Sequence, residues 1–343
     1  MSVPQKMFAL TLKDGGYSAT AEGPTIKTLE PYLAAGEIPV PTPGPGQALI
    51  KVIQSSINPS DLHFIKGEYG LPRVKGAPAG FEGCGTVVAA GDGAQGLIGK
   101  RVGFVATASG AWAEYALTDA TSCFPVMDGV ADKDAAALFV NPLTAIAMFG
   151  EMKALGSKSF IMSAAASQLC KLIAGLALEE GYSAISLVRR DDQISHLKEL
   201  GATHVLNVTD ADFMKTLGGI MKEKKPRMFL DAVADQTSSD IFFAMPAKAE
   251  WVIYGKLSPQ LPSLTQTGQF IFMDKHIRGF WLTKWLREQK PDVAMAAAVK
   301  VQQMFASGKW STDLRATVSL REAHERLPVE LARANTGKVM LVP

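Results

Sequence analysis

The sequence predicts an α/β fold in which a small β-barrel domain is combined with a domain built on a doubly wound parallel sheet. Many short strand-like segments, separated by glycine and proline turns, occupy residues 1–130, which is typical of a small barrel. Between residues 141 and 282, strand-like and helix-like segments alternate, and such alternation is typical of a parallel sheet with helices on both faces.

The composition narrows the class of protein further. With 343 residues, of which 47% are apolar, the chain is long enough for two domains with sizeable cores. A net charge of +2 is too small to predict binding to nucleic acid or to a membrane surface. No apolar segment reaches the length of a membrane span, and the N-terminus lacks the pattern of a signal peptide. Three widely spaced cysteines suggest buried thiols, so we expect a cytoplasmic protein.

The first domain is predicted from a series of short strands. They are expected at Met7–Lys13, Ala48–Ile57, Gly80–Ala90, 99–103 and Ala111–Leu117. Four prolines and two glycines in residues 39–46 predict an extended connection. The glycines at Gly80, Gly83 and Gly85 predict bulges or a close approach of two backbones. A helical region is expected to begin at residues 132–138 and to lead into the second domain.

A strand–helix–strand unit spans Ser157–Arg190 and organises the second domain. Its helix has apolar residues at helical spacing and ends at Gly181, and a strand follows at Ala184–Val188. Such a crossover joins two parallel strands. The turn before the helix consists of small residues, which would bring backbone N–H groups to a pyrophosphate. The glycine fingerprint of dinucleotide-binding proteins is eroded here, since its three glycines fall on Ala165, Ser167 and Cys170.

Two arginines follow the second strand of this unit. Enzymes that use NAD usually carry an acidic residue at this strand end, whereas the forked donors of Arg189 and Arg190 suit the 2′-phosphate of NADPH. The alternative is that the two arginines form a solvated strand end in a domain that binds no nucleotide. The stretch by itself leaves both interpretations open.

The remaining elements of the second domain follow in alternation. Helices are expected at Ile194–Leu200, Ala211–Lys224 and Ser238–Met245, and strands at His204–Asn207, Met228–Val233, Trp251–Gly255 and Phe270–Leu282. A helix at Pro291–Ser307 and a terminal strand at 337–342, which rejoins the first domain, complete the chain. The predicted bounds are therefore 1–140 and 283–343 for the two parts of the catalytic domain, and 141–282 for the cofactor domain.

Short motifs along the chain carry a family resemblance. They are Asn58-Pro59-Ser60-Asp61, Lys66-Gly67-Glu68-Tyr69-Gly70, Gly80-Phe81-Glu82-Gly83-Cys84-Gly85, Val140-Asn141-Pro142-Leu143-Thr144-Ala145, Leu200-Gly201-Ala202-Thr203-His204-Val205 and Arg278-Gly279-Phe280-Trp281-Leu282. In this order they resemble the medium-chain dehydrogenase/reductase superfamily over nearly the whole chain. Within it the chain is most similar to the zinc-free quinone oxidoreductases and the mitochondrial-type 2-enoyl thioester reductases.

The resemblance implies an architecture and an assembly. It implies a GroES-like barrel built from both ends of the chain, with a Rossmann domain inserted between them. It also implies a homodimer joined edge to edge through the last Rossmann strand, here near 277–281, because an exposed strand edge is a natural pairing surface.

The resemblance also bears on metal binding. Zinc-dependent relatives place Cys, His and Cys ligands at the positions of Asn58, Phe81 and Asn141, and none of these side chains supplies a thiolate or an imidazole. Asp61, His63 and Glu82 lie nearby in sequence but do not rebuild the site. We therefore expect no metal, and we expect His63 to be a polar surface or cleft residue.

Without zinc, the expected chemistry is hydride transfer from NADPH to a conjugated C=C bond of a 2-enoyl thioester or enone. Tyr69 matches the active-site tyrosine of the enoyl thioester reductases, and a phenol that is protonated at neutral pH can donate a hydrogen bond to an enolate oxygen. The alternative is a turn tyrosine with its ring on the surface.

The resemblance also implies the contacts to the cofactor. They are Asn58, Asn141, Ser167, Gln168, Leu169, Arg189, Tyr254, Gly255, Phe280, Trp281, Leu282 and Lys338, to which charge and position add Arg190. The two asparagines could instead cap local turns. The second arginine of the family falls on Asp191 in this chain.

Two other functions remain open at this stage. The chain could be an NADPH:quinone oxidoreductase, or a protein of another class that binds NADPH without catalysis. In each case the expected small-molecule partners are NADPH and, for an enzyme, an electron-poor acceptor.

Overall fold

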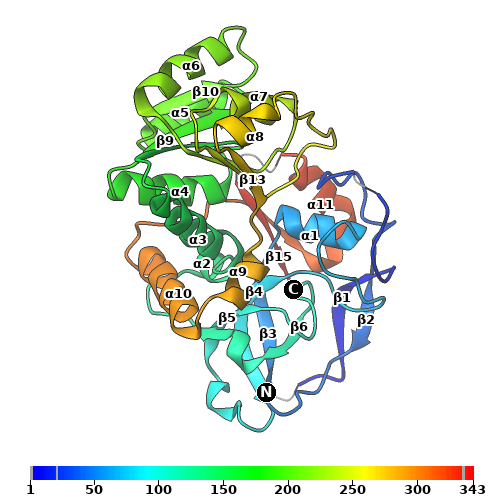
Figure 1. Ribbon diagram of the computed structural model, residues 1–343. Helices are drawn as coiled ribbons and strands as arrows, with labels where there is room; N and C mark the ends of the chain where they lie inside the picture. The colour runs from blue at the N-terminus through cyan, green and yellow to red at the C-terminus, as the bar shows by residue number, and fades with distance from the viewer. Residues whose placement is uncertain (1–2, 21, 334–336) are drawn as a thin grey trace. The chain divides into compact units, whose positions relative to one another are not determined.

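The computed structural model describes residues 3–20, 22–333 and 337–343 (Figure 1). The chain divides into two compact units: unit 1 consists of Met1–Pro142 and Ala298–Pro343, and unit 2 of Leu143–Ala297. The second division falls inside helix α10 (Pro291–Ala306), whereas the bound expected from the sequence lies at residue 282.

Unit 2 is built on a six-stranded parallel sheet. In spatial order its strands are β10 (His204–Asn207), β9 (Ser183–Val188), β8 (Ser159–Met162), β11 (Met228–Asp231), β12 (Glu250–Ile253) and β13 (His276–Gly279). The chain adds strands outward from β8 to β10, then returns to β11 and adds strands on the other side. The sheet is therefore doubly wound, as predicted, and the order reverses between β8 and β11, where such sheets bind their ligands.

Helices connect the strands of this sheet. They are α4 (Gln168–Glu179), α5 (Asp192–Glu199), α6 (Phe213–Lys224), α7 (Gln236–Ala244), α8 (Gly268–Phe272) and α9 (Leu282–Glu288). The predicted apolar stripe of α4 is confirmed, because Leu169, Leu172, Ile173 and Leu176 are all buried. Gly181 follows this helix with a φ of 71°, a conformation that favours glycine.

One predicted strand is largely wrong. The segment Phe270–Leu282 contains a strand only at His276–Gly279, and Gly268–Phe272 instead forms the short helix α8. The ring of Phe270 packs on the rings of Phe242 and Phe243, with centroids 6.0 Å away in each case. These partners belong to helix α7, so tertiary packing decides the conformation of a short apolar run that could form either element.

Unit 1 contains a seven-stranded sheet and a separate strand pair. The sheet runs β14 (Leu314–Ser319), β15 (Lys338–Val342), β3 (Gln47–Ser56), β4 (Glu82–Ala90), β5 (Arg101–Val105) and β7 (Cys123–Pro125), with β6 (Tyr115–Asp119) also paired to β3. The strand pair consists of β1 (Lys6–Leu12) and β2 (Leu33–Pro39). The terminal strand β15 lies between β14 and β3, which confirms that the tail rejoins the first domain.

The glycines of β4 allow close approach of the neighbouring strand, as predicted. A Cβ atom at Gly85 would lie 2.2 Å from the carbonyl oxygen of Lys51 on β3, so no larger residue fits there. The pairing of β3 with β4 also shifts register twice, between Leu49 and Ile50 and between Val52 and Gln54. These irregularities bend the strands of a small barrel.

Several elements of unit 1 were not predicted. The helix α1 (Pro59–Lys66) begins at the N-cap Asn58 with a proline in its first turn, which is a recognisable start signal. The strand β2 contains Gly36, and the helix α11 (Ala323–Leu331) contains Pro328, so both run against local propensity. The helical region expected to begin at residues 132–138 is present as α2 (Asp132–Ala135) and α3 (Val140–Ala154), and the 3₁₀ turns lie at Gln95–Leu97, Ala120–Ser122 and Leu320–Glu322. Within the described ranges, no helix combines the length and the apolar character needed to cross a membrane.

Candidate active site

A buried polar network surrounds Asn58 in unit 1. The Asn58 side chain donates to Glu82 Oε1 at 2.8 Å and to Ser56 Oγ at 3.1 Å, and its Oδ1 accepts a hydrogen bond from Lys338 Nζ at 2.6 Å. Both N–H groups of the amide are therefore used within the protein, and Asn58 is almost fully buried. The structure thus brings together two predicted cofactor residues, Asn58 and Lys338, that lie 280 positions apart.

Glu82 links this network to the start of helix α3. Its Oε1 accepts hydrogen bonds from Ser56 and Asn58, and its Oε2 accepts from the backbone N–H groups of Phe139 and Val140 at 3.0 Å each. An anion at a helix N-terminus is stabilised by the unsatisfied N–H groups there. Glu82 therefore anchors the backbone directly before Asn141, which is half-buried.

The charges in this network are almost fully removed from solvent. Asp61 accepts hydrogen bonds from the backbone N–H groups of Asn58 at 2.8 Å and Phe81 at 2.9 Å. Burial raises the pKa of Asp61 to about 7, although these hydrogen bonds and Lys338 lower it. Burial lowers the pKa of Lys338, while Glu82 and Asp61 raise it. The Lys338 ammonium is thus close enough to both carboxylates to interact with them electrostatically.

The residues at the metal-ligand positions take other roles. Asn58 belongs to the polar network, and Phe81 packs its ring on Tyr69 and Phe64. In the part of the chain that the structure describes, no group of three or more His, Cys, Asp or Glu residues is arranged to hold a metal ion. His63 was expected to be a polar surface or cleft residue; it is buried, with its Nδ1 3.3 Å from Glu68 Oε2, so it is not a surface residue.

Tyr69 lies in an aromatic cluster just after helix α1. Its ring centroid is 5.2 Å from that of Phe81 and 6.5 Å from that of Phe64, and the residue is half-buried. The helix ends at Gly67, whose φ of 80° turns the chain sharply. The ring therefore contacts two neighbouring aromatic rings and remains partly exposed.

In unit 2, the turn after β8 forms without its glycines. Ala164 has a φ of 48°, an uncommon conformation for a residue with a Cβ atom. Ser167 is the N-cap of α4, and its Oγ accepts a hydrogen bond from the backbone N–H of Cys170, which leaves its O–H available to donate to a ligand. The Cys170 side chain is buried beneath the helix, with Sγ 3.3 Å from Tyr254 Oη. Gln168 and Leu169 occupy the first turn of the same helix.

A buried carboxylate supports this turn. Asp231, at the end of β11, accepts hydrogen bonds from Ser163 Oγ at 2.5 Å, from Trp251 Nε1 at 2.9 Å and from the backbone N–H groups of Val233 and Ala234. Ser163 directly follows β8, so Asp231 joins the ends of the two strands between which the sheet order reverses. It shapes the edge at which such sheets bind ligands.

Both predicted phosphate-binding arginines already face carboxylates. Arg189 Nη2 lies 3.5 Å from Asp235 Oδ2, and Arg190 Nε donates to Asp192 Oδ1 at 2.9 Å. The Arg189 side chain is 64% exposed, so its forked donors are accessible to a ligand. Asp191 accepts a hydrogen bond from Asn207 and points to the neighbouring strand.

The other predicted cofactor residues lie after the following strands. Tyr254 and Gly255 come directly after β12, and a Cβ atom at Gly255 would lie 2.9 Å from the carbonyl oxygen of Ala232, so the two loops approach closely. Phe280 is buried and donates its backbone N–H to Ile253. Trp281 is the N-cap of α9 and Leu282 its first residue; both are half-buried.

Several buried side chains of these sites were not predicted as functional residues. The sequence identifies Glu82 and Asp61 only as neighbours of the missing metal ligands, and no sequence motif assigns a role to Asp231, Ser163 or Glu68. A charged residue within or directly after an apolar strand, such as Asp231 after Met228–Leu230, is a signal that could have identified one of them, because buried charges need partners.

Comparison with known proteins agrees with this architecture. Residues 44–128 match the alcohol dehydrogenase GroES-like domain, and residues 169–299 match the zinc-binding dehydrogenase family. A crystal structure of a "putative NADPH:quinone reductase" from Mesorhizobium loti is 52% identical, with a TM-score of 0.96 and full coverage of both chains. A mitochondrial enoyl-acyl-carrier-protein reductase from Bos taurus is 29% identical over 283 residues, which are 80% of this chain and 74% of that protein.

A more distant structure shares the fold. The complex of Etr1p with NADP and crotonyl-CoA is 21% identical, has a TM-score of 0.80 and covers 98% of this chain and all of that one. A split barrel combined with a doubly wound sheet, together with amide and aromatic side chains at the metal-ligand positions, defines a two-domain oxidoreductase without catalytic zinc. The chain belongs to the medium-chain dehydrogenase/reductase superfamily, in its zinc-free branch.

Proposed function

We propose that the protein is an NADPH-dependent reductase that adds hydride to the β carbon of a 2-enoyl thioester or enone. The observation that carries the proposal is the place of Tyr69. Its ring packs on Phe81, the residue that stands where zinc-dependent relatives have a histidine ligand. A phenol thus lies beside the position at which those relatives polarise their substrate with a metal.

The chain supplies the groups that this reaction needs besides the hydride. NADPH, when bound, supplies the hydride. Reduction of the C=C bond leaves negative charge on the thioester or ketone oxygen, and the Tyr69 hydroxyl donates a hydrogen bond to that oxygen. The aromatic rings of Phe64 and Phe81 exclude water on one side of the phenol, which strengthens this interaction.

The residues of unit 2 fit the cofactor. The exposed Arg189 offers a forked donor set to a 2′-phosphate, and Arg190 lies next to it in the chain. Ser167 and the backbone at the start of α4 are suited to a pyrophosphate. We assign the remaining cofactor contacts to the residues predicted above: Asn58, Asn141, Gln168, Leu169, Tyr254, Phe280, Trp281, Leu282 and Lys338.

The test is NADPH oxidation against a panel of acceptors, namely a 2-enoyl-CoA, a simple enone and a quinone, with NADH in parallel. We expect turnover of the enoyl-CoA or the enone with NADPH. In Tyr69→Phe, kcat should fall by about 10²-fold or more, because one donor to the developing oxyanion is lost. The dissociation constant of NADPH should not change. An unchanged kcat in Tyr69→Phe would remove the phenol from the mechanism.

A second candidate function is reduction of a quinone by NADPH. The similarity that favours it is the Mesorhizobium loti structure, which is 52% identical and carries that description. Rapid turnover of the quinone alone, at equal rates in wild type and Tyr69→Phe, would select this candidate over the first.

We also propose a homodimer that forms through the free edge of the unit 2 sheet. Within the described residues β13 pairs only with β12, and large apolar side chains are exposed in the segment before it, among them Leu261, Ile271 and Phe272. Exposed apolar groups next to an open strand edge favour pairing with a second copy.

A cytoplasmic location remains our proposal for the compartment. The cysteines at Cys84, Cys123 and Cys170 are all buried free thiols, which suits a reducing environment. Fractionation of the source cells with an antibody to the protein would test it, and recovery in a membrane or secreted fraction would contradict it.

A further inference from the structure

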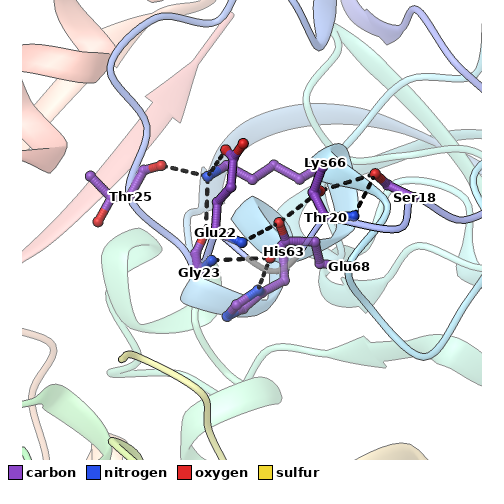
Figure 2. Close-up of polar contacts among 8 residues, drawn as sticks. All are labelled: Ser18, Thr20, Glu22, Gly23, Thr25, His63, Lys66 and Glu68. Carbon is purple, nitrogen blue, oxygen red and sulfur yellow. Dashed lines mark hydrogen bonds and ion pairs between the residues drawn. The ribbon is translucent and has the colours of Figure 1, made fainter. Parts of the chain in front are cut away.

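A buried glutamate lies directly before Tyr69 in the chain. The Glu68 side chain is 1% exposed, and its carboxylate accepts hydrogen bonds from Thr20 Oγ1 at 3.0 Å and from the backbone N–H groups of Glu22 at 2.8 Å and Gly23 at 3.1 Å. His63 Nδ1 lies 3.3 Å from Oε2 of this carboxylate (Figure 2). Burial raises the pKa of Glu68, but these hydrogen bonds outweigh it and bring the pKa below its ordinary value. The carboxylate is thus held by several donors at once.

The positively charged side chain of Lys66 contacts the same part of the chain, near Gly23. Lys66 is buried at the end of helix α1, and its ammonium donates to the carbonyl oxygens of Gly23 at 2.9 Å and Thr25 at 2.7 Å. Gly23 is therefore bound through its N–H by Glu68 and through its C=O by Lys66 (Figure 2). Its φ of 78° lies in the left-handed region that favours glycine.

These contacts tie two distant segments together. We call residues 18–20 and 22–25 the strap. The strap also contacts the helix end through its backbone, because Ser18 donates its N–H to the carbonyl oxygen of Gly67 at 2.9 Å. The loop 67–72, which carries Tyr69, is therefore anchored before the tyrosine by Gly67 and Glu68.

The same loop is anchored after the tyrosine by a second buried charge. Arg73 is 8% exposed and donates to the carbonyl oxygens of Gly16 at 3.1 Å and Ile65 at 3.1 Å. In the chain, Tyr69 thus lies between two buried charged side chains, Glu68 and Arg73. Glu68 binds the strap, and Arg73 binds Gly16, which precedes the strap. A loop held at both ends keeps a side chain in one position, whereas a short exposed turn does not.

We propose that Glu68 is a positioning residue for the reaction: by binding the strap through its carboxylate, it fixes the backbone that presents the Tyr69 hydroxyl. This inference rests on the proposed role of Tyr69. It deepens that role, because it assigns the orientation of the phenol to a contact between the loop that follows helix α1 and a segment more than 40 residues earlier in the chain.

The test compares Glu68→Gln with wild type by two measurements on the whole protein. The glutamine has the same shape, but its NH₂ group cannot accept the hydrogen bonds that one carboxylate oxygen now receives. Amide hydrogen exchange at Glu22 and Gly23 should accelerate about tenfold or more. For the acceptor that the panel selects, kcat should fall about tenfold, because a small displacement of a catalytic group is costly. The dissociation constant of NADPH, measured without acceptor, should stay the same.

Two further variants keep the test decisive. Glu37→Gln removes one negative charge from an exposed position on β2 and should change neither measurement. Thr20→Val removes a single donor at the exposed side of the strap and should give an intermediate increase in exchange, even if Glu68→Gln fails to fold.

The outcomes separate this inference from the proposed function. If Tyr69→Phe is slow while Glu68→Gln matches wild type in exchange or in kcat, the positioning role is wrong and the function stands. If Tyr69→Phe turns over as fast as wild type, the donor role of Tyr69 and the positioning role built on it both fall. Weakened NADPH binding in Glu68→Gln would mean a general loss of structure and would also overturn the assignment.

Discussion

Individual charged residues of the candidate site are bound to partners inside the protein. Asp231 and Glu82 each accept hydrogen bonds from backbone N–H groups and from side chains, and Lys338 and Lys66 each donate to two carbonyl or amide oxygens. A buried charge is tolerated only when it is paired in this way. These residues shape the site, whereas the Arg189 side chain is largely exposed and Tyr69 and Ser167 are half-buried.

At Arg189 an internal carboxylate competes with the proposed phosphate. Asp235 lies 3.5 Å from the guanidinium, so a bound 2′-phosphate would bring a second negative group to the same place. Asp235→Asn should therefore bind NADPH more tightly and leave NADH binding unchanged. Helix α7 should persist in this variant, because Asp235 is its N-cap and asparagine caps a helix equally well. Titration with each cofactor, followed by fluorescence, measures the effect.

In the same titration, Arg189→Ala should have the opposite effect. Losing one charge-assisted contact to the phosphate should weaken NADPH binding by about 1.5–3 kcal/mol, again without effect on NADH. If Arg189→Ala binds both cofactors as wild type does, the phosphate lies elsewhere and the effect predicted for Asp235→Asn disappears with it.

Helix α1 is the element on which unit 1 presents the site. Its N-terminus is joined to β4 and β15 through Asn58 and Asp61, and its C-terminus carries Lys66 and Glu68. Of its eight residues, Leu62 and Ile65 contribute to the apolar core of unit 1. The helix is too short to be stable alone, so these charged contacts at both ends determine where it lies.

The N-terminal contacts of α1 predict a pH dependence of stability. Burial raises the pKa of Asp61 from 3.8 to about 7, so the folded protein binds more protons than the unfolded chain between these values. The stabilisation from this group is complete below pH 3.8 and is lost as the pH rises through about 7. The difference in unfolding free energy between wild type and Asp61→Asn should therefore fall with rising pH, by up to about 1.4 kcal/mol per pH unit.

Urea unfolding at a series of pH values measures this difference. Asp14→Asn, at an exposed position in the same unit, is the control and should run parallel to wild type. A difference between wild type and Asp61→Asn that stays constant from pH 4 to 7 would show that Asp61 titrates alike in the folded and unfolded chain.

The turn before α4 shows how an element can form without its usual residues. In the glycine fingerprint, glycines allow a tight turn and close packing of helix on strand. Here Ala164 takes a φ of 48°, the N-cap Ser167 binds the N–H of Cys170, and the buried Cys170 side chain takes up the space beneath the helix. The support comes from Ser163 and Asp231, which hold the strand end on one side of the turn.

At the scale of the whole molecule, the exposed edge of the unit 2 sheet is the feature that bears on assembly. Ile271 and Phe272 are 77% and 85% exposed, and both lie in α8, directly before the edge strand β13. We expect the purified protein to sediment as a dimer. Phe272→Asp should shift it toward the monomer, because a charge would be buried without a partner in the interface.

The control for this experiment lies at the opposite edge of the sheet. Met214 is 39% exposed in α6, a helix that contacts the other edge strand β10, so Met214→Asp should leave the dimer intact. Sedimentation of wild type as a monomer at micromolar concentration, or loss of the dimer in both variants, would contradict an interface at β13.

The sequence predicted most elements of unit 2 and fewer of unit 1. In unit 2, helical periodicity and buried apolar runs agree with the final structure, as in α4 and β9, because each element buries a regular stripe or a whole strand. In unit 1, β2 contains a glycine and α11 contains a proline, and both form because long-range pairing and packing override their propensity. The short helix α8, which forms where a strand was expected, is likewise decided by tertiary packing.

By itself, the sequence determined that the chain combines a barrel with a doubly wound sheet, that the metal-ligand positions hold Asn58, Phe81 and Asn141, and that arginines follow β9. Residue type and periodicity are local properties, so they can be read along the chain. The tertiary structure alone decided which polar side chains meet. Lys338 reaches Asn58 across 280 positions and Glu68 reaches Gly23 across 45, and no local pattern encodes such a contact, because its free energy depends on burial that exists only in the folded protein.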